Sequence, residues 1–260
     1  MHRLGWALLC VGVTSLGPRT PATPQEPAAP RKTVAVLYFD NYTGSADYDA
    51  LGRGIASMMI SDLSSVQQIQ LVERERLQDL VKEMDAQQTK YFDSTTAVKV
   101  GQLAGAEYVI TGALAAAQPN IRIDTRVVRV ETGEIVKTAR VTGHEDKFFD
   151  LEQKLAKQLI DGLAIALSPE EQERLRAQQE ANRIDELKTM VSFSQAMAMS
   201  DRGDYVGAAE KMGPVLRDAP NSLLVHMTYD EIKQRAAGKA RQKATDKVKE
   251  GVGRFFRKKP

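Results

Sequence analysis

The strongest constraint on the fold is an apolar run near the start of the chain. Residues 33–39 read Thr-Val-Ala-Val-Leu-Tyr-Phe and contain no charged side chain. A strand of this composition is covered on both faces, which is typical of the parallel strands in α/β proteins. The run therefore predicts a central strand with helices on both sides of its sheet.

Helices and strands are expected to alternate after this run. Turn residues at 40–44 end the first strand. The elements expected next are a helix at 51–66, a strand at 69–72, a helix at 77–84 and a helix that runs to about Leu103. The first of these helices has apolar residues at three- and four-residue spacing, with Asp62 as a polar exception. Either Ser94 or Thr95 is expected to cap the last of them.

Three strands and a long helix complete the first part of the chain. The strands are expected at 107–115, 121–130 and 134–142. The short turn between the last two contains Gly133, so these two should form an antiparallel hairpin. The helix carries an apolar stripe of Phe149, Leu155, Leu159, Leu163 and Leu167. Residues 32–167 are therefore predicted to form a mixed-sheet α/β sandwich domain.

An all-α helical extension is predicted over residues 168–237. Ser168-Pro-Glu-Glu171 has the form of a capping box with proline at the first helical position, so a new helix begins there. Ala196, Gly203-Asp204-Tyr205, Ala208 and Pro220 stand where a tetratricopeptide helix pair has its small residues, its turn and its closing proline. A single pair cannot bury a continuous core, so it must pack on neighbouring helices, the α/β domain or another subunit.

The N-terminus has the features of an export signal. His2 and Arg3 precede an apolar run that is too short to span a bilayer, and small residues follow it. Residues 1–22 are therefore predicted to be a signal peptide, and residues 23–31 a proline-rich linker. Cys10, the only cysteine, is either removed with the signal or lipidated. If it is removed, disulfides and cysteine-ligated zinc are excluded.

Five segments resemble the CsgG family of curli production assembly and transport components. In chain order they are 34–44 (VAVLYFDNYTG), 51–63 (beginning LGRGIA), 71–77 (LVERERL), 105–112 (GAEYVITG) and 126–135 (RVVRVETGEI). The resemblance covers residues 33 to about 167. It implies an envelope protein with an α/β fold.

The same segments also have structural interpretations. Gly52 and Gly54 do not form a dinucleotide or phosphate-binding motif, so they should permit a tight loop and close helix packing. Residues 73–76 (Glu-Arg-Glu-Arg) are expected to form a solvated, partly self-paired helix start. Asp40 and Asn41 are interpreted as turn residues first and as ligands second.

The resemblance also implies where membrane hairpins would be inserted. Channel-forming members of the family have two such hairpins per subunit, which correspond to residues 115–120 and 142–147 here. Each membrane strand needs about 9–11 residues, so neither gap can hold a hairpin. The chain is therefore expected to lack its own transmembrane barrel.

No catalytic, cofactor-binding or metal-binding site is predicted. The three histidines are His2, His144 and His226, and no zinc-protease motif, nucleophile elbow or spaced acid pair accompanies them. With two histidines left after signal removal, a dedicated transition-metal site is not expected. The chain is predicted not to be an enzyme.

The last segment, residues 238–260, is a basic tail. From Lys239 to the end it carries nine Lys or Arg against two acids. One interpretation is an amphipathic segment that contacts an anionic surface such as a membrane, and the other is a solvated, frayed terminus. The candidate contact residues are Arg254, Phe255, Phe256, Arg257, Lys258 and Lys259.

These observations lead to one preferred function and two alternatives. The preferred one is a non-enzymatic exported envelope protein, a periplasmic scaffold or accessory factor in outer-membrane assembly or in the secretion of surface structures. We expect it to be a homo-oligomer that contacts other envelope proteins, in the periplasm or at the outer membrane, and not nucleic acid. The alternatives are an oligomeric outer-membrane secretion channel component and a periplasmic module whose loop at 41–49 binds a ligand.

Overall fold

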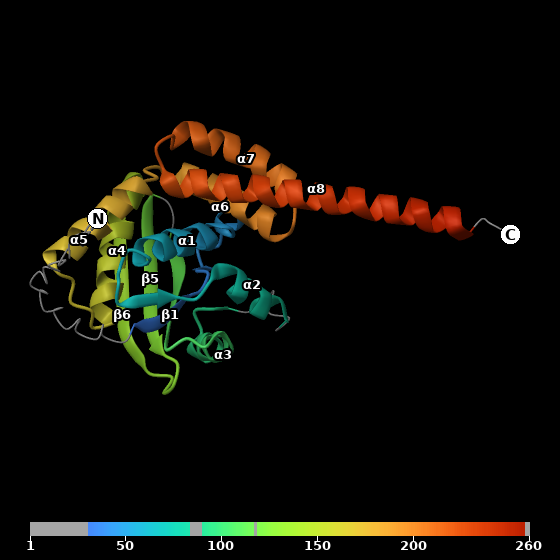
Figure 1. The fold of residues 1–260 in the computed structure, drawn as a ribbon. Coiled ribbons are helices and arrows are strands. Elements are labelled where there is room, and N and C mark those ends of the chain that lie inside the picture. The colour runs from blue at the N-terminus through green and yellow to red at the C-terminus, as the bar shows by residue number, and fades with distance from the viewer. Residues whose placement is uncertain (1–30, 84–89, 117–118, 258–260) are drawn as a thin grey trace, which may run out of the picture.

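The fold is a mixed β-sheet with helices on both faces (Figure 1). A further group of helices packs against α1 (Leu51–Leu63), one of the helices that cover the sheet. The structure is a computed structural model and describes residues 31–83, 90–116 and 119–257. The predicted fold class, a mixed-sheet α/β sandwich followed by an all-α extension, is confirmed. The predicted signal peptide and nearly all of the predicted linker lie outside the described residues.

The sheet combines parallel and antiparallel strands. Its strands are β1 (Lys32–Val36), β2 (Asp40–Asn41), β3 (Ile69–Leu71), β4 (Tyr108–Ala116), β5 (Asn120–Arg129) and β6 (Ile135–His144). The order is β3-β1-β4-β5-β6, and β2 pairs with β4 beyond the end of β1. β1 runs parallel to β3 and β4, whereas β4, β5 and β6 are antiparallel. The predicted hairpin between the last two strands is confirmed.

The predicted first strand was too long. β1 ends at Val36, and the chain leaves the ladder before it pairs with β4 again at β2. The cause is the packing of Phe39, whose N–H donates to the carbonyl of Gly52, 3.3 Å away. A Cβ at Gly52 would overlap the Phe39 carbonyl oxygen, and one at Gly112 would overlap the Phe39 ring. Glycine at both positions therefore lets Phe39 turn into the core.

Helices cover both faces of the sheet because the side chains of β1 alternate between two cores. Val34 and Val36 face a core that contains α1 (Leu51–Leu63) and α4 (Phe148–Gly162). Ala35 and Leu37 face a smaller core under α2 (Arg74–Glu83) and α3 (Ser94–Ala104). The continuous apolar run thus has the physical cause inferred from the sequence, since both faces of β1 are buried.

Two predicted helix ends differ from the observed ones. The N-cap of α3 is Asp93, whose carboxylate accepts from the N–H of Thr96, rather than Ser94 or Thr95. α4 ends at Gly162, so Leu163 and Leu167 lie beyond the helix to which they were assigned. The chain reverses there through Ala164, which has a φ of 53°. The carbonyl of Leu163 accepts from Lys32 Nζ at 2.7 Å, which ties this turn to β1.

The helical extension shares the larger core of the α/β domain. It consists of α5 (Pro169–Ala181), α6 (Leu187–Asp201), α7 (Tyr205–Asp218) and α8 (Leu223–Arg257). The predicted capping box at Ser168 and Glu171 is present. Met190 and Phe193 of α6 are fully buried in the core that also contains α1. A Cβ at Gly54 would overlap Ser194 and Met190, so Gly54 allows α1 and α6 to approach closely, as predicted.

The predicted helix pair corresponds to α6 and α7. Gly203, at a φ of 81°, and Asp204, which caps α7, form the turn between them. Ala196 and Ala208 are fully buried at the packed face. Of the alternatives for what covers this pair, the structure shows the α/β domain on one side and α8 on the other (Figure 1).

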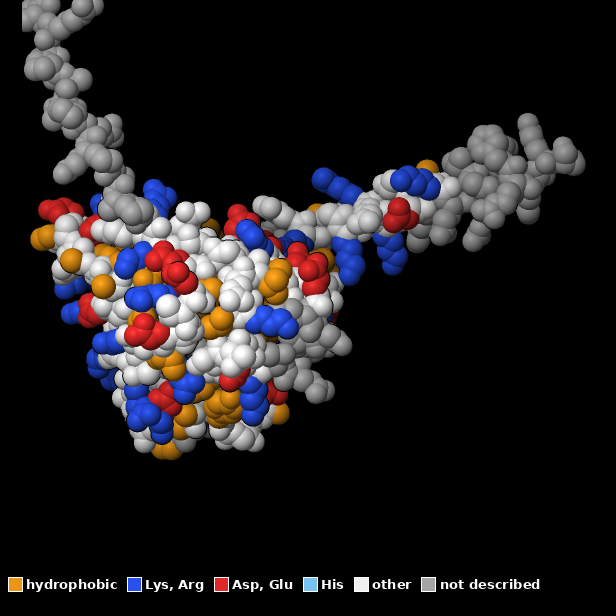
Figure 2. Space-filling model, turned by 90° about the horizontal axis from the view of Figure 1, so that it is seen from below, with side chains coloured by type: hydrophobic (Ala, Val, Ile, Leu, Met, Phe, Trp, Pro, Cys, Tyr) orange, Lys and Arg blue, Asp and Glu red, His pale blue; other side chains and the backbone are white. Residues whose placement is uncertain are grey.

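The last helix, α8, passes through the predicted start of the basic tail at residue 238 without a break. What changes near this point is burial. Val225 and Ile232 are buried, whereas every side chain described over residues 237–249 is exposed. The helix projects from the body (Figure 1), and Lys and Arg side chains lie along it (Figure 2). Arg254, Phe255, Phe256 and Arg257 fall in its last turns, and Lys258 and Lys259 lie outside the described residues.

The two connections where the family resemblance would place hairpins are short. β4 ends at Ala116 and β5 begins at Asn120. β6 is followed at once by a 3₁₀ turn, Glu145–Lys147, and then by α4. Across the parts of the chain that the structure describes, no helix is both long and apolar enough to cross a membrane.

The close approach at Gly52 leads to a prediction. Gly52→Ala should lower the free energy of unfolding by about 2–3 kcal/mol, because the added methyl group meets a backbone carbonyl that cannot move without shifting β2. Gly238→Ala is the matched control, since a Cβ there meets nothing within 4 Å. Urea denaturation measures both, and equal stability of the two variants would contradict this packing.

Candidate functional site

The candidate site is a cluster of polar side chains at the carboxyl end of the parallel strands. Open α/β sheets bind ligands at this edge. Tyr38 follows β1, Arg53 lies in the first turn of α1, and Arg74 is the first residue of α2. Both helices begin here because the strand before each of them ends at this edge. Two guanidinium groups and a phenol therefore converge on one position, which we call the cradle.

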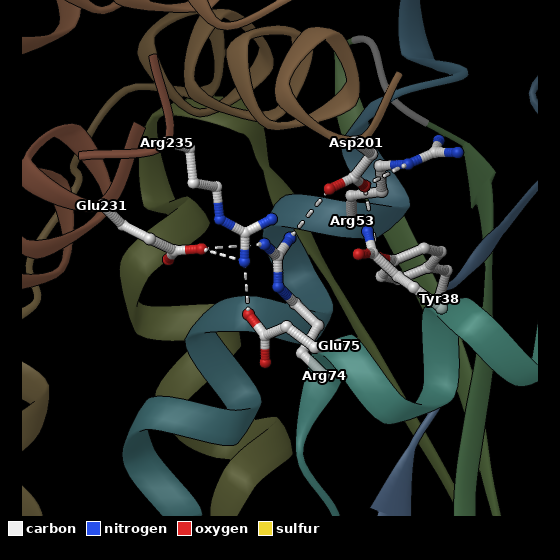
Figure 3. A network of polar contacts seen from close by, with 8 residues as sticks. Tyr38, Arg53, Arg74, Glu75, Asp201, Glu231 and Arg235 are labelled. Carbon is white, nitrogen blue, oxygen red and sulfur yellow. Dashed lines mark hydrogen bonds and ion pairs between the residues drawn. The ribbon is translucent and has the colours of Figure 1, made fainter. Parts of the chain in front are cut away.

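The cradle is occupied by the carboxylate of Asp201, the last residue of α6 (Figure 3). Asp201 Oδ2 lies 3.3 Å from Arg53 Nε, in ion-pair rather than hydrogen-bond geometry, and accepts from Tyr38 Oη at 3.3 Å. Asp201 Oδ1 accepts from Arg74 Nη1 at 3.4 Å. The side chain of Asp201 is 9% exposed. The helical extension therefore supplies the anion that this edge of the sheet holds.

Each charged side chain of the cradle lies at the helix end whose partial charge has the same sign as its own. A helix has partial positive charge at its N-terminus and partial negative charge at its C-terminus. Arg53 and Arg74 are cations near N-termini, and Asp201 is an anion at a C-terminus. Bringing the three together offsets these separate costs. Loss of Asp201 would leave two partly buried cations facing each other, which is far more costly than loss of a surface pair.

Next to the cradle, a second group of ion pairs joins α8 to α2. Glu231 of α8 lies 3.9 Å from Arg74 and 2.6 Å from Arg235. Arg235 also donates to Glu75 at 2.9 Å. The prediction of a solvated, partly self-paired helix start is therefore wrong for Arg74, whose ion-pair partners Asp201 and Glu231 belong to the extension. Glu75 is exposed, as predicted, but its partner is Arg235 of the extension. Arg74 is also largely buried, at 14% exposure.

The chemistry of the cradle suits holding a charge rather than moving a proton. Burial, and then the charge of Asp201, raise the pKa of Tyr38 to about 12. Its phenol therefore stays protonated at neutral pH and donates to Asp201, while Gln78 donates to it at 2.9 Å. The adjoining cavity between Tyr38, Arg74 and Tyr91 is about 20 Å³, which is room for about one water molecule.

Asp40 and Asn41 have structural roles close to this edge. The Asp40 carboxylate accepts from the N–H groups of Tyr91 and Phe92 at 3.1 and 2.9 Å. Burial raises its pKa despite these hydrogen bonds. The amide of Asn41 bonds within its own loop, to Thr43, Ser45 and Asp49. The contacts of Asn41 agree with its interpretation as a turn residue. Asp40 instead pairs within β2 and holds the distant segment at residues 91–92.

The loop at 41–49, proposed above as a ligand-binding loop, borders an open groove of about 670 Å³. Its wall includes Asp47 and Tyr48 of the loop, the acids Glu145 and Asp146 before α4, and Glu186 before α6. Leu187, Val191 and the cation Lys188 also line the groove, and Lys188 pairs with Glu186. The groove is acidic and wide open, so it would suit a cationic ligand if it held one.

A buried pair of carboxyl groups lies between α1, α4 and α5. Glu152 is 1% exposed, and Asp62 is completely buried. Asp62 accepts from Gln179 at 2.9 Å and from Asn182 at 3.3 Å. Burial raises the pKa of Asp62, and these two hydrogen bonds oppose that rise by favouring its ionised form. Burial, and then the charge of Asp62, raise the pKa of Glu152 well above its ordinary value. We therefore assign the proton to Glu152.

His144 and His226, the histidines within the described residues, do not share a site. Nδ1 of His144 lies 2.8 Å from Asp146, and Nε2 of His226 lies 2.7 Å from the carbonyl of Pro220. In the described parts of the chain no group of three or more His, Cys, Asp or Glu is placed to hold a metal ion.

Sequence reasoning missed the cradle because its members are far apart along the chain. Arg74 and Asp201 are 127 positions apart, and none of the motifs connects them. One signal was present: an aspartate just before the Gly203 turn ends a helix with the wrong charge. Such a residue calls for a cationic partner, although the sequence does not say which one.

Comparison with known proteins relates the α/β domain to a transport family. The family model "Curli production assembly/transport component CsgG" matches residues 20–122. The resemblance to the CsgG family that the sequence motifs indicate is therefore confirmed. The matched residues make up less than half of the chain and lie within its first half.

A curated relative and several solved structures are also similar to the chain. "Putative adenylate cyclase 3" of Rhizobium meliloti (strain 1021) is 27% identical over 152 residues, which are 58% of this chain and 24% of that protein. The chain thus spans about a quarter of the length of this relative.

Three solved structures illustrate the structural likeness. The LpoB C-terminal domain from Escherichia coli has a TM-score of 0.37 and 16% identity, covering 46% of this chain and 87% of that one. Lipoprotein GNA1162 from Neisseria meningitidis has a TM-score of 0.39 and 13% identity, and the match covers 51% of this chain and 98% of that one. A PelC dodecamer from Paraburkholderia phytofirmans has a TM-score of 0.32 and 17% identity, and the match covers 54% of this chain and 94% of that one. At these TM-scores the likenesses carry no argument about function.

The buried carboxyl pair leads to a prediction about pH. The pKa of Glu152 is higher in the folded protein than in the unfolded chain, so its contribution to stability is fully present below the ordinary glutamate value of 4.5. This contribution is lost as the pH rises through the raised pKa. The free energy of unfolding should therefore fall less between pH 5 and pH 8 in Glu152→Gln than in the wild type.

Urea denaturation at the two pH values measures this difference. The substituted amide keeps the size of the side chain and carries no charge, so the variant should fold. Equal falls in the two proteins would show that Glu152 is ionised in the folded state.

Proposed function

We propose, on the basis of the CsgG family match to its α/β domain, that this chain is a non-enzymatic exported envelope protein. It acts as a periplasmic scaffold or accessory factor in outer-membrane assembly or in the secretion of surface structures. The family match is the observation that carries the proposal. The export step rests on the signal peptide predicted over residues 1–22.

The polar clusters support a non-enzymatic role. The cradle is filled by a side chain of the same protein, Asp201, and the cavity beside it has room for about one water molecule. Tyr38 keeps its proton at neutral pH, and Glu152 is enclosed away from solvent. Strongly shifted pKa values also arise in structural networks, and these two fit that case.

The arrangement of the two halves supports a scaffold. The extension and the α/β domain share one apolar core and are joined by the cradle, so they present their surfaces in one fixed orientation. A scaffold needs this property because each of its partners must be held relative to the others. We further propose that the protein forms homo-oligomers and binds other envelope proteins.

Two alternative functions, a secretion channel component and a ligand-binding module, make different predictions. As a secretion channel component, the chain would have to conduct ions across planar bilayers. As a ligand-binding module, it would use the acidic groove beside Asp47 and Tyr48, and basic metabolites or peptides should raise its melting temperature.

The proposal predicts location and assembly together. Cell fractionation should find the protein in the periplasm or with the outer membrane, because the signal directs it there. Light scattering after size-exclusion chromatography should give a mass that is a multiple of the exported chain, since the proposed scaffold is a homo-oligomer. A strictly monomeric species at high concentration, or a protein confined to the cytoplasm, would contradict the proposal.

A further inference from the structure

The second half of α8 extends away from the body of the protein. Residues 237–257 span about 30 Å at the rise of an α-helix. From Ala237 to Lys249 every described side chain is exposed, and the buried side chains of α8 belong to its first half. Lys239, at the base, reaches back to the carbonyl of Gly203 at 2.7 Å. We call residues 237–249 the α8 projection (Figures 1 and 2).

A helix of this kind lacks the main source of helical stability. In proteins most of that stability comes from packing an apolar face, and isolated helices of this length are marginal in water. The α8 projection buries no apolar face on the rest of the described chain. Its helical state would therefore be stabilised by a surface that covers one of its sides.

Apolar and charged side chains lie on different faces of the α8 projection. Ala237, Ala240, Ala244 and Val248 recur at three- and four-residue spacing and share one stripe, in which Val248 is 65% exposed. Each residue turns the helix by about 100°, so Asp246, two positions from both Ala244 and Val248, lies opposite the stripe.

Basic residues flank the stripe on both sides. Lys243 lies about 100° to one side of Ala244, and Lys249 about 100° to the other side of Val248. Arg241 lies about 60° from Ala244, at the border of the stripe. The sequence continues the pattern with Val252, Phe255 and Phe256, and the count from Lys239 to the end is nine bases against two acids.

We propose that the α8 projection binds the surface of a bilayer that contains anionic phospholipids. The apolar stripe enters the boundary between headgroups and acyl chains, and the flanking lysines reach the phosphate groups. Asp246 faces water on the opposite side. The helix then lies along the bilayer surface and holds the α/β domain next to it.

Charge favours this occupant over a second copy of the same helix. Two projections side by side would bring five bases against five, and like charges along a helix pair repel. An anionic bilayer has the complementary charge and also accepts the apolar stripe. The proposal needs only such a bilayer, so it stands independently of the proposed scaffold role.

Paired dye-labelled variants test the orientation of the helix. The full chain carries Cys10→Ser together with either Val248→Cys on the stripe or Asp246→Cys opposite it, each labelled with a polarity-sensitive dye. With vesicles of phosphatidylglycerol and phosphatidylcholine, the dye at 248 should shift to the blue and the dye at 246 should not. Equal shifts at both positions, or none at 248, would overturn the proposal.

Charge reversal tests the electrostatic part. In vesicle flotation, Arg241→Glu/Lys243→Glu/Lys249→Glu should weaken binding to the anionic vesicles at least tenfold. The matched control, Lys99→Glu/Lys154→Glu/Lys157→Glu, reverses three exposed charges on α3 and α4 and should bind like the wild type. Any binding through the predicted N-terminal apolar run is common to both variants.

Three results would overturn the proposal. The first is equal binding by the two triple variants, and the second is wild-type binding to pure phosphatidylcholine that is as tight as to the anionic mixture. The third is an oligomer of the wild type that the α8 variant alone loses without vesicles, which would assign the projection to a second copy of the chain.

Discussion

The architecture depends on one buried carboxylate, that of Asp201. It stands at the end of α6 and meets guanidinium groups from α1 and α2 and the phenol of Tyr38. Each of these charges would be unfavourable where its own helix places it. Together they compensate one another, and they do so at the edge where an open α/β sheet usually receives a ligand. The protein has filled this edge with its own extension.

The consequence is that the two halves behave as one body. Gly54 allows α1 to pack directly on α6, so the extension continues the core of the α/β domain. The second group of ion pairs, which includes Glu75, Glu231 and Arg235, then ties the start of α8 to α2. The direction of the α8 projection is thereby set relative to the sheet. A partner or surface bound by that projection is held at a fixed position from the α/β domain.

The sequence predicted what is governed by local pattern. The sheet strands, the hairpin around Gly133 and the capping box at Ser168 follow from neighbouring residues, and they are present. The end of β1 could not be predicted, because it depends on Phe39 meeting Gly52 and Gly112. The predicted N-cap of α3, Ser94 or Thr95, lies one or two residues after the observed cap, since Asp93, Ser94 and Thr95 are all good capping residues.

The cradle could not be predicted either, because it depends on contacts between residues that are far apart in the sequence. Residues 73–76 alternate acid and base, which looks like self-pairing when only the sequence is available. Their partners, Asp201 and Arg235, are brought to them by the packing of α6 and α8. The buried pair of Asp62 and Glu152 was hidden as well, since Asp62 was noted only as a polar exception in an apolar stripe.

A double-mutant cycle between Arg74 and Asp201 tests the central claim most directly. Arg74→Met and Asp201→Asn preserve size and remove charge, and Arg183 with Asp185 provides an exposed control pair. If the cradle joins the two halves, urea denaturation should give a coupling free energy of about 1.5–3 kcal/mol for Arg74 and Asp201. The exposed control pair should give less than about 0.5 kcal/mol. Additive effects at Arg74 and Asp201, within about 0.3 kcal/mol, would contradict the account.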